Sequence, residues 1–157
     1  MNIDLVVVGR TNVSFVEAGM SEYVKRLGRY VRFGVVTVPD VKGGGSLSEG
    51  ELKEREGAAL VSALSDYDRV VLLDEHGTER GSEEFAQWLE QAMNRSVRRL
   101  AFVVGGAYGF SQRVRALTKE SISISRMTFS HQMIRLLFVE QLYRAFTIIR
   151  KEPYHHR

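Results

Sequence analysis

The chain has 157 residues, 44% of them hydrophobic and 26% charged, which is about the size of one domain with a single core. It contains no cysteine, so disulfides, thiolate metal sites and cysteine nucleophiles are excluded. The net charge of +3 divides into −6 over residues 1–94 and +9 over residues 95–157, so the basic part predicts either a polyanionic partner or a solvated face that pairs with the acidic part.

Strand and helix patterns alternate along the chain. Short β-branched runs predict strands, and apolar residues at helical spacing between caps predict helices. In chain order we expect strand Ile3–Val8, helix Ser14–Leu27, strand Phe33–Val38, a mobile loop at Lys42–Ser46, helix Ser48–Leu64, strand Arg69–Asp74, a Ser82-capped helix to Asn94, strand Leu100–Val104, a short helix from Ser111, strand Ser121–Ser125 and helix Ser130–Arg150.

This alternation predicts an α/β fold over residues 1–157 as a single domain. We expect a mainly parallel sheet of five or six strands with helices on both faces. The last helix is apolar over more than one stripe, from Met133 to Ile149. That surplus favours a twofold homodimer contact, and the alternative is a helix buried centrally in one chain.

Two further features indicate where the protein resides. The N-terminus opens directly on the strand Ile3–Val8 with no basic leader, and no apolar run approaches the roughly 18 residues of a membrane span. We therefore expect a cytoplasmic protein with no membrane contact.

Ligands of parallel sheets bind beyond the carboxyl ends of the strands. Three such ends stand out here: Leu72–Gly77, Gly105–Gly109 and Ser125–Phe129. Glycines let a backbone approach a ligand closely, but a Gly-Gly-x-x-Gly turn is equally consistent with a purely structural role. Asp74–Glu75 fits either a ribose contact or a polar exit from a strand.

Common catalytic and nucleotide motifs are absent from the sequence. There is no Gly-x-Gly-x-x-Gly, no phosphate-binding Gly-Lys-Ser/Thr, no His-Glu-x-x-His and no Gly-x-Ser-x-Gly. The adjacent His155 and His156 are more typical of a solvated tail than of a ligand set. We expect no metal.

Several stretches, in this order, carry a resemblance to a known family: Leu73 with the Gly77 loop and Ser82–Ala86, Val104–Gly109, Ser123–Gln132, Glu140–Phe146 and Glu152–His156. Together they resemble the SPOUT superfamily, in particular its pseudouridine-N3 methyltransferases of the large ribosomal RNA, over essentially the whole chain. One departure is Ser130, where the family usually has proline. Proline would preset the first turn of the helix, and serine can cap that turn instead. The difference therefore does not weaken the resemblance.

The resemblance implies a reaction, a fold and partners. S-adenosyl-L-methionine donates a methyl group to N3 of a pseudouridine in 23S rRNA of the assembled ribosome, and the enzyme is a homodimer with a C-terminal trefoil knot. The cofactor contacts implied are Leu73, Gly105, Ile124, Ser125, Arg126, Met127, Thr128 and Phe129. The catalytic candidates are Arg144, Tyr154 and His155.

The sequence alone leaves two questions open: which arginines contact the rRNA, and whether the function is the one that the resemblance implies. Candidates for contact with the rRNA backbone are Arg113, Arg115, Arg126, Arg135 and Arg144. The alternatives to this function are a non-catalytic protein that binds RNA or the ribosome, and a SPOUT enzyme that methylates another RNA such as tRNA.

Overall fold

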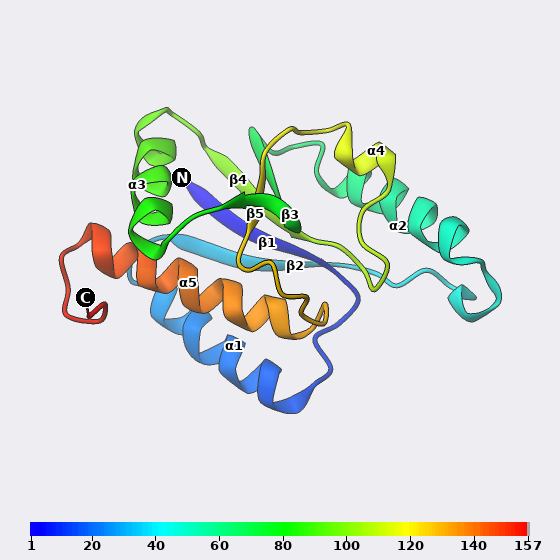
Figure 1. The fold of residues 1–157 in the computed structure, drawn as a ribbon, viewed down its shortest axis with the longest axis horizontal. Helices are drawn as coiled ribbons and strands as arrows, with labels where there is room; N and C mark the ends of the chain where they lie inside the picture. Colours follow the sequence, from blue (N-terminus) through cyan, green and yellow to red (C-terminus); the bar gives the residue numbers. More distant parts are fainter. Residues whose placement is uncertain (157) are drawn as a thin grey trace.

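The computed structural model describes residues 1–156 and contains one fully parallel sheet (Figure 1). The strand order is β2-β1-β4-β3-β5. The strands are β1 (Asn2–Val8), β2 (Arg32–Val38), β3 (Arg69–Glu79), β4 (Arg99–Val104) and β5 (Ser121–Ser123). The predicted α/β class and parallel sheet are confirmed, with five strands.

Helices cover both faces of the sheet, as expected (Figure 1). Helices α1 (Ser14–Leu27), α3 (Ser82–Asn94) and α5 (Met133–Ile149) pack on one face, and α2 (Glu49–Ala63) and the short α4 (Gln112–Arg115) pack on the other. Successive strand side chains point to opposite faces, so Leu5 and Val7 belong to the first core and Val6 and Val8 to the second.

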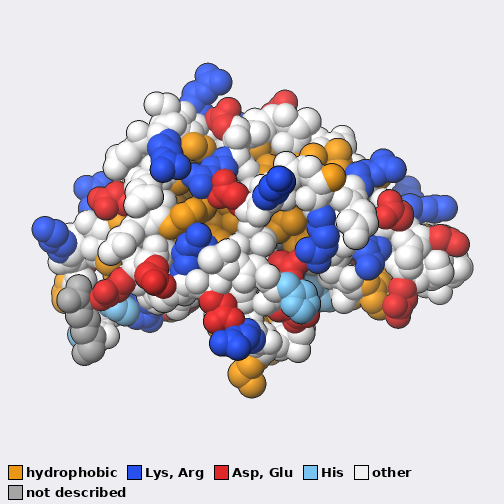
Figure 2. Space-filling view, turned by 45° about the horizontal axis from the view of Figure 1, so that its top comes forward, with side chains coloured by type: hydrophobic (Ala, Val, Ile, Leu, Met, Phe, Trp, Pro, Cys, Tyr) orange, Lys and Arg blue, Asp and Glu red, His pale blue; other side chains and the backbone are white. Residues whose placement is uncertain are grey.

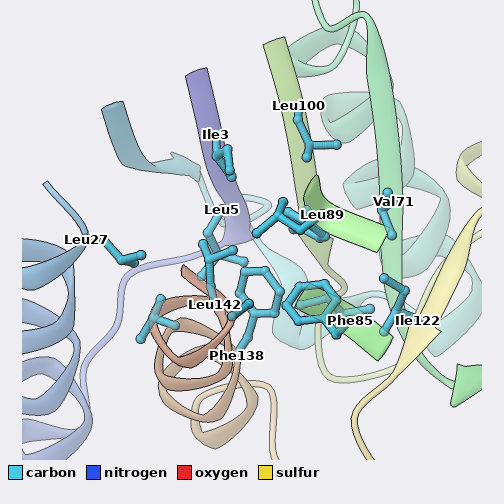
Figure 3. Close-up of a cluster of buried hydrophobic side chains, with 14 of the residues drawn as sticks. Ile3, Leu5, Leu27, Val71, Phe85, Leu89, Leu100, Ile122, Phe138 and Leu142 are labelled. Atoms are coloured by element: carbon cyan, nitrogen blue, oxygen red, sulfur yellow. The ribbon is translucent and has the colours of Figure 1, made fainter. Parts of the chain in front are cut away.

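The larger core forms where α3 and α5 meet the sheet. Figure 3 shows Phe85 of α3 and Phe138 of α5 beside the strand side chains Leu5 and Ile122. The ring centroids of Phe102 and Phe138 lie 4.6 Å apart, within the range of favourable aromatic pairs. This packing fixes α5 over the middle of the sheet.

Helix α5 lies between α1 and α3, which accounts for part of its wide apolar surface. Gly19 of α1 allows the close approach, since a Cβ atom there would lie 2.7 Å from a methyl carbon of Leu136. On the other side, the Ser82 hydroxyl of α3 donates to Gln141 Oε1 of α5 at 2.8 Å. The homodimer therefore stays a prediction, because part of the apolar surplus is buried within the chain.

Several element ends differ from expectation. The cap predicted at Ser82 is wrong: helix α3 begins after Gly81, whose N–H donates to Glu84 Oε2. Strand β3 continues five residues past Asp74, because its pairing with β5 resumes at Thr78 after a register shift. The helices predicted from Ser48 and Ser111 are confirmed, and each of these hydroxyls caps its helix by accepting the N–H three residues on. The loop predicted at residues 42–46 contains a 3-10 turn (Gly44–Ser46).

Candidate functional site

A cavity of about 520 Å3 opens at the carboxyl ends of β3, β4 and β5. This volume falls within the range of small-molecule sites. The three strand ends singled out from the sequence all contribute to its wall. Of the expected cofactor contacts, those that line it are Leu73, Gly105, Ile124, Ser125, Met127, Thr128 and Phe129. Arg126 is not among the lining residues, since its exposed side chain pairs with Glu79 at 2.7 Å.

The glycine loop after β4 forms one wall and is tightly packed at Gly105 and Gly106. A Cβ atom at Gly105 would lie 3.1 Å from the backbone of Gly109, and one at Gly106 would lie 2.2 Å from Glu56 Oε2. Gly109 has a φ of +80° and donates its N–H to the Gly106 carbonyl. The loop is therefore both a tight turn and a cavity wall, so the two interpretations of these glycines are compatible.

The loop between β5 and α5 forms the opposite wall and is held by its own serines. The Ser123 hydroxyl donates to the Ser125 carbonyl, and the Ser125 hydroxyl accepts the Met127 N–H. The Ser130 hydroxyl accepts the Met133 N–H at 3.1 Å, as a cap at the start of the helical turn. Serine thus does at this position what the family's proline does by fixing the backbone.

Asp74 is part of the cavity wall. Its Oδ1 accepts the His76 N–H at 2.9 Å, and its Oδ2 lies 2.6 Å from Nη1 of Arg115. Oδ2 is buried and has no well-aligned hydrogen bond. The interpretation of Asp74–Glu75 as a polar exit from a strand is wrong, because β3 continues to Glu79, and the ribose contact stays a prediction.

Glu56 of α2 lies behind the glycine loop and is 8% exposed. Burial and the Asp40 carboxylate raise the pKa of Glu56 above its ordinary value. A raised pKa means that the folded state holds the proton to higher pH than the unfolded state, so this group costs stability as pH rises through that interval.

We expect Glu56→Gln to increase stability at pH 7.5 relative to the wild type, with the difference shrinking toward pH 4. Urea unfolding midpoints at both pH values measure this, with the exposed Glu54→Gln on the same helix as the control. A difference that is the same at both pH values would contradict the prediction.

Arg135 is fully buried at the start of α5. Its guanidinium donates to the carbonyls of Val8, Gly9 and His131 and to the Thr11 hydroxyl, over 2.7 to 3.0 Å. It therefore ties the end of β1 to the turn that lines the cavity. Its predicted role in contacting rRNA is wrong, because no part of it reaches the surface.

Part of the basic C-terminal charge is paired with the acidic N-terminal part. Arg115 pairs with Asp74 and Arg126 with Glu79, whereas the pair of Arg69 with Glu120 joins the two parts with the charges reversed. Figure 2 shows basic and acidic side chains interleaved over one face of the molecule. Arg113 is exposed and keeps its place as a candidate for an RNA backbone contact.

The three catalytic candidates Arg144, Tyr154 and His155 lie together on the tail and the last turns of α5. Glu140 Oε1 accepts from Arg144 Nη2 at 2.6 Å and from the Tyr154 hydroxyl at 3.0 Å. Arg144 Nη1 lies 3.3 Å from Nδ1 of His155, and because a guanidinium only donates, Nδ1 acts as the acceptor. Neither Glu140 nor Tyr23, whose hydroxyl is 3.2 Å from that of Tyr154, was predicted to take part.

These contacts set the protonation of the cluster. Burial, with hydrogen bonds to Tyr23 and Glu140, raises the pKa of Tyr154 well above its ordinary value. The hydrogen bond to Glu140 raises the pKa of Arg144. At neutral pH the cluster therefore offers a cationic guanidinium and a protonated phenol, both hydrogen-bond donors.

The cluster and the cavity lie at opposite ends of α5. Arg144 follows Ile134, a cavity residue, by ten positions, which is about 15 Å along a helix. Figure 1 shows the tail folded beside the end of α5 that is remote from the loop before it. Within one chain, the structure brings the catalytic candidates together but does not place them at the cavity.

The comparison with known protein families decides the class of protein. The family described as "Predicted SPOUT methyltransferase" matches residues 1–155. The chain belongs to this family of methyltransferases. Among described residues, no helix is long and apolar enough to cross a membrane, and no group of three or more His, Cys, Asp or Glu is arranged to hold a metal ion.

Relatives of this SPOUT chain match it from end to end. A protein of Parabacteroides distasonis named "Ribosomal RNA large subunit methyltransferase H" is 49% identical over 156 residues, or 99% of each chain. One of the same name from Flavobacterium johnsoniae is 46% identical over 157 residues, or 100% of each. The recognition made from the sequence motifs is confirmed.

Solved structures share the fold at low sequence identity. A probable methylase family protein from Haemophilus influenzae Rd KW20 has a TM-score of 0.59 and 14% identity, covering 99% of this chain and 71% of that one. A tRNA (m1G37) methyltransferase from Aquifex aeolicus has a TM-score of 0.54 and 16% identity, covering 100% and 76%. These likenesses show the fold alone, and the trefoil knot stays a prediction.

Proposed function

We propose that the protein transfers a methyl group from S-adenosyl-L-methionine to N3 of a pseudouridine in 23S rRNA of the ribosome, in the cytoplasm. The observation that carries this proposal is the cavity, because the three segments that the family resemblance assigns to the cofactor converge on it. The full-length relatives named for the large-subunit rRNA indicate the substrate.

The residues present fit an adenosine derivative. Gly105 and Gly106 line the cavity and have no side chain to fill it, while Leu73, Val104 and Ile124 provide apolar walls. Asp74 adds a buried carboxylate. The cofactor supplies a methyl group on a sulfonium, whose S–C bond breaks as the N3–C bond forms. What the protein must do is hold the donor and align the attacking nitrogen.

The tail cluster fits the other half of the reaction. N3 of the base loses its proton before or during attack, which leaves negative charge on the ring. Arg144 stabilises that charge as a donor, and His155 assists the departure of the proton. Tyr154 donates its single O–H to Glu140, which also holds Arg144, so Tyr154 positions the guanidinium. Because the pKa of Tyr154 is raised, this residue donates a hydrogen bond and does not act as the base.

The distance between cavity and tail supports a homodimer. Arg144 lies about 15 Å along α5 from the cavity of its own chain, so a second subunit that presents its tail to this cavity would complete the site. The rRNA would then meet a surface built from two subunits.

The deciding experiment is transfer of labelled methyl groups to ribosomes from a strain that lacks this gene. Protein-free 23S rRNA and tRNA serve as the other substrates. We expect label on intact ribosomes, at N3 of one pseudouridine. Label on tRNA would favour the other SPOUT activity, and S-adenosylmethionine binding with no transfer to any RNA would refute the proposed substrate.

Methyl transfer should also depend steeply on salt. If several arginines and lysines neutralise rRNA phosphates, raising salt from about 50 to 200 mM lowers substrate affinity by orders of magnitude, because binding releases counterions. The measurement is kcat/KM for ribosomes across this range, with S-adenosylmethionine affinity at the same salt concentrations as the control. A flat profile would exclude the electrostatic contribution.

A further inference from the structure

The cavity holds very few charged side chains. Among its described lining residues, Arg115 is the single Lys or Arg, and Asp74 and Glu75 are the two carboxylates. The neighbouring wall is formed by glycines and apolar side chains, which suit an adenosine but leave the amino-acid end of S-adenosylmethionine without a charged partner. That end is a zwitterion, with one carboxylate and one ammonium group.

Arg115 is held at the cavity by the fold. It ends the short helix α4, which begins after the cap Ser111, and its own N–H donates to the Ser111 carbonyl at 3.1 Å. Its Nη1 lies 2.6 Å from Asp74 Oδ2, and its guanidinium carbon lies 5.8 Å from the centre of the Phe110 ring. The side chain is 42% exposed, so part of it is accessible to a ligand.

Asp74 is the buried half of this pair. Its side chain is only 7% exposed, and Oδ2 has no well-aligned hydrogen bond although it lies beside a guanidinium. A buried carboxylate oxygen without a good donor carries a desolvation cost that a cationic ligand group relieves. Arg115 has five N–H donors, and its contact with Asp74 runs through Nη1, so it is able to bind a second carboxylate.

We propose that Arg115 and Asp74 form the subsite for the amino-acid end of the cofactor. Arg115 binds the cofactor carboxylate, and Asp74 accepts from the cofactor ammonium group while it orients Arg115. This inference rests on the proposed function, because it requires that the cavity binds S-adenosylmethionine. It also moves Arg115 from the rRNA-contact candidates to the cofactor site.

The test compares ligands with and without the amino-acid end. S-adenosylhomocysteine carries that end and 5′-methylthioadenosine lacks it, and isothermal titration calorimetry on the full-length protein gives both Kd values. We expect Arg115→Met to weaken S-adenosylhomocysteine about 10- to 100-fold, the range for a charge-assisted hydrogen bond, with methylthioadenosine unchanged. Asp74→Asn should weaken S-adenosylhomocysteine in the same selective way.

Two further variants keep the result interpretable. Arg113→Met, an exposed position on the same short helix and not a lining residue, should change neither Kd. Arg115→Lys keeps the charge but loses the planar fork, so it should fall between wild type and Arg115→Met. Thermal unfolding of each variant shows whether the fold is kept.

Equal losses for both ligands in Arg115→Met would overturn the inference, since they would indicate a change of cavity shape. Unchanged binding of S-adenosylhomocysteine with a lower salt slope for ribosomes would overturn it in favour of a phosphate contact. If the wild type binds neither of these ligands nor S-adenosylmethionine, the proposed function is wrong and the subsite falls with it. That outcome is distinct from a selective failure of the variants.

Discussion

Arg135→Met is expected to lower the free energy of unfolding by about 3 kcal/mol or more. The substitution leaves the Val8, Gly9 and His131 carbonyls without the donor they have in the folded protein, and each buried unsatisfied acceptor costs roughly 1 to 3 kcal/mol. Burial of the charged guanidinium has a desolvation cost, which lowers the pKa of Arg135. The substitution removes this cost, and the gain offsets part of the loss in stability. With four hydrogen bonds lost, we expect the unsatisfied acceptors to dominate.

Urea unfolding measures this change, and a fall in Tm of about 10 °C accompanies it for a chain of this size. The exposed Arg113→Met is the matched control, since it removes the same charge from the surface. Because Arg135 holds the His131 backbone at the cavity, the variant should also bind S-adenosylmethionine more weakly. An unfolding free energy within 0.5 kcal/mol of wild type, roughly the level of a surface substitution, would contradict the assigned role.

Arg144→Ala is expected to lower the single-turnover rate of methyl transfer about 100- to 1,000-fold, the effect of removing one donor from a developing negative charge. Its guanidinium carbon also lies 4.8 Å from the centre of the Tyr154 ring. The substitution therefore removes a contact with this ring as well as the positive charge. Affinity for S-adenosylmethionine should be unchanged, because Arg144 is not among the residues that line the cavity.

Arg26→Ala provides the control for Arg144→Ala. Arg26 pairs with Glu22 in the same i,i+4 arrangement, on α1, and faces the Tyr23 and Tyr143 rings. It should leave the rate within a few fold of wild type. A wild-type rate in Arg144→Ala would remove this residue from the mechanism.

Local patterns predicted most of the secondary structure. The apolar runs at Ile3–Val8 and Leu100–Val104 form β1 and β4, and the helices predicted from Ser48 and Ser111 begin at those residues' caps. Element ends were less well predicted, because contacts distant in sequence decide them. Strand β3 extends to Glu79 through pairing with β5, and Ser82 bonds to Gln141 of α5 and does not cap its own helix.

The sequence by itself determined the α/β class, the parallel sheet, the three segments at the cavity and the family, since each depends on local periodicity or on contiguous motifs. Only the tertiary structure decided which charges are available for function. Arg135 and Arg113 are the same residue type in the sequence, yet Arg135 is buried among backbone carbonyls and Arg113 is exposed. The separation of the cavity from Arg144 likewise follows from the length and placement of α5, because burial and distance depend on how elements pack.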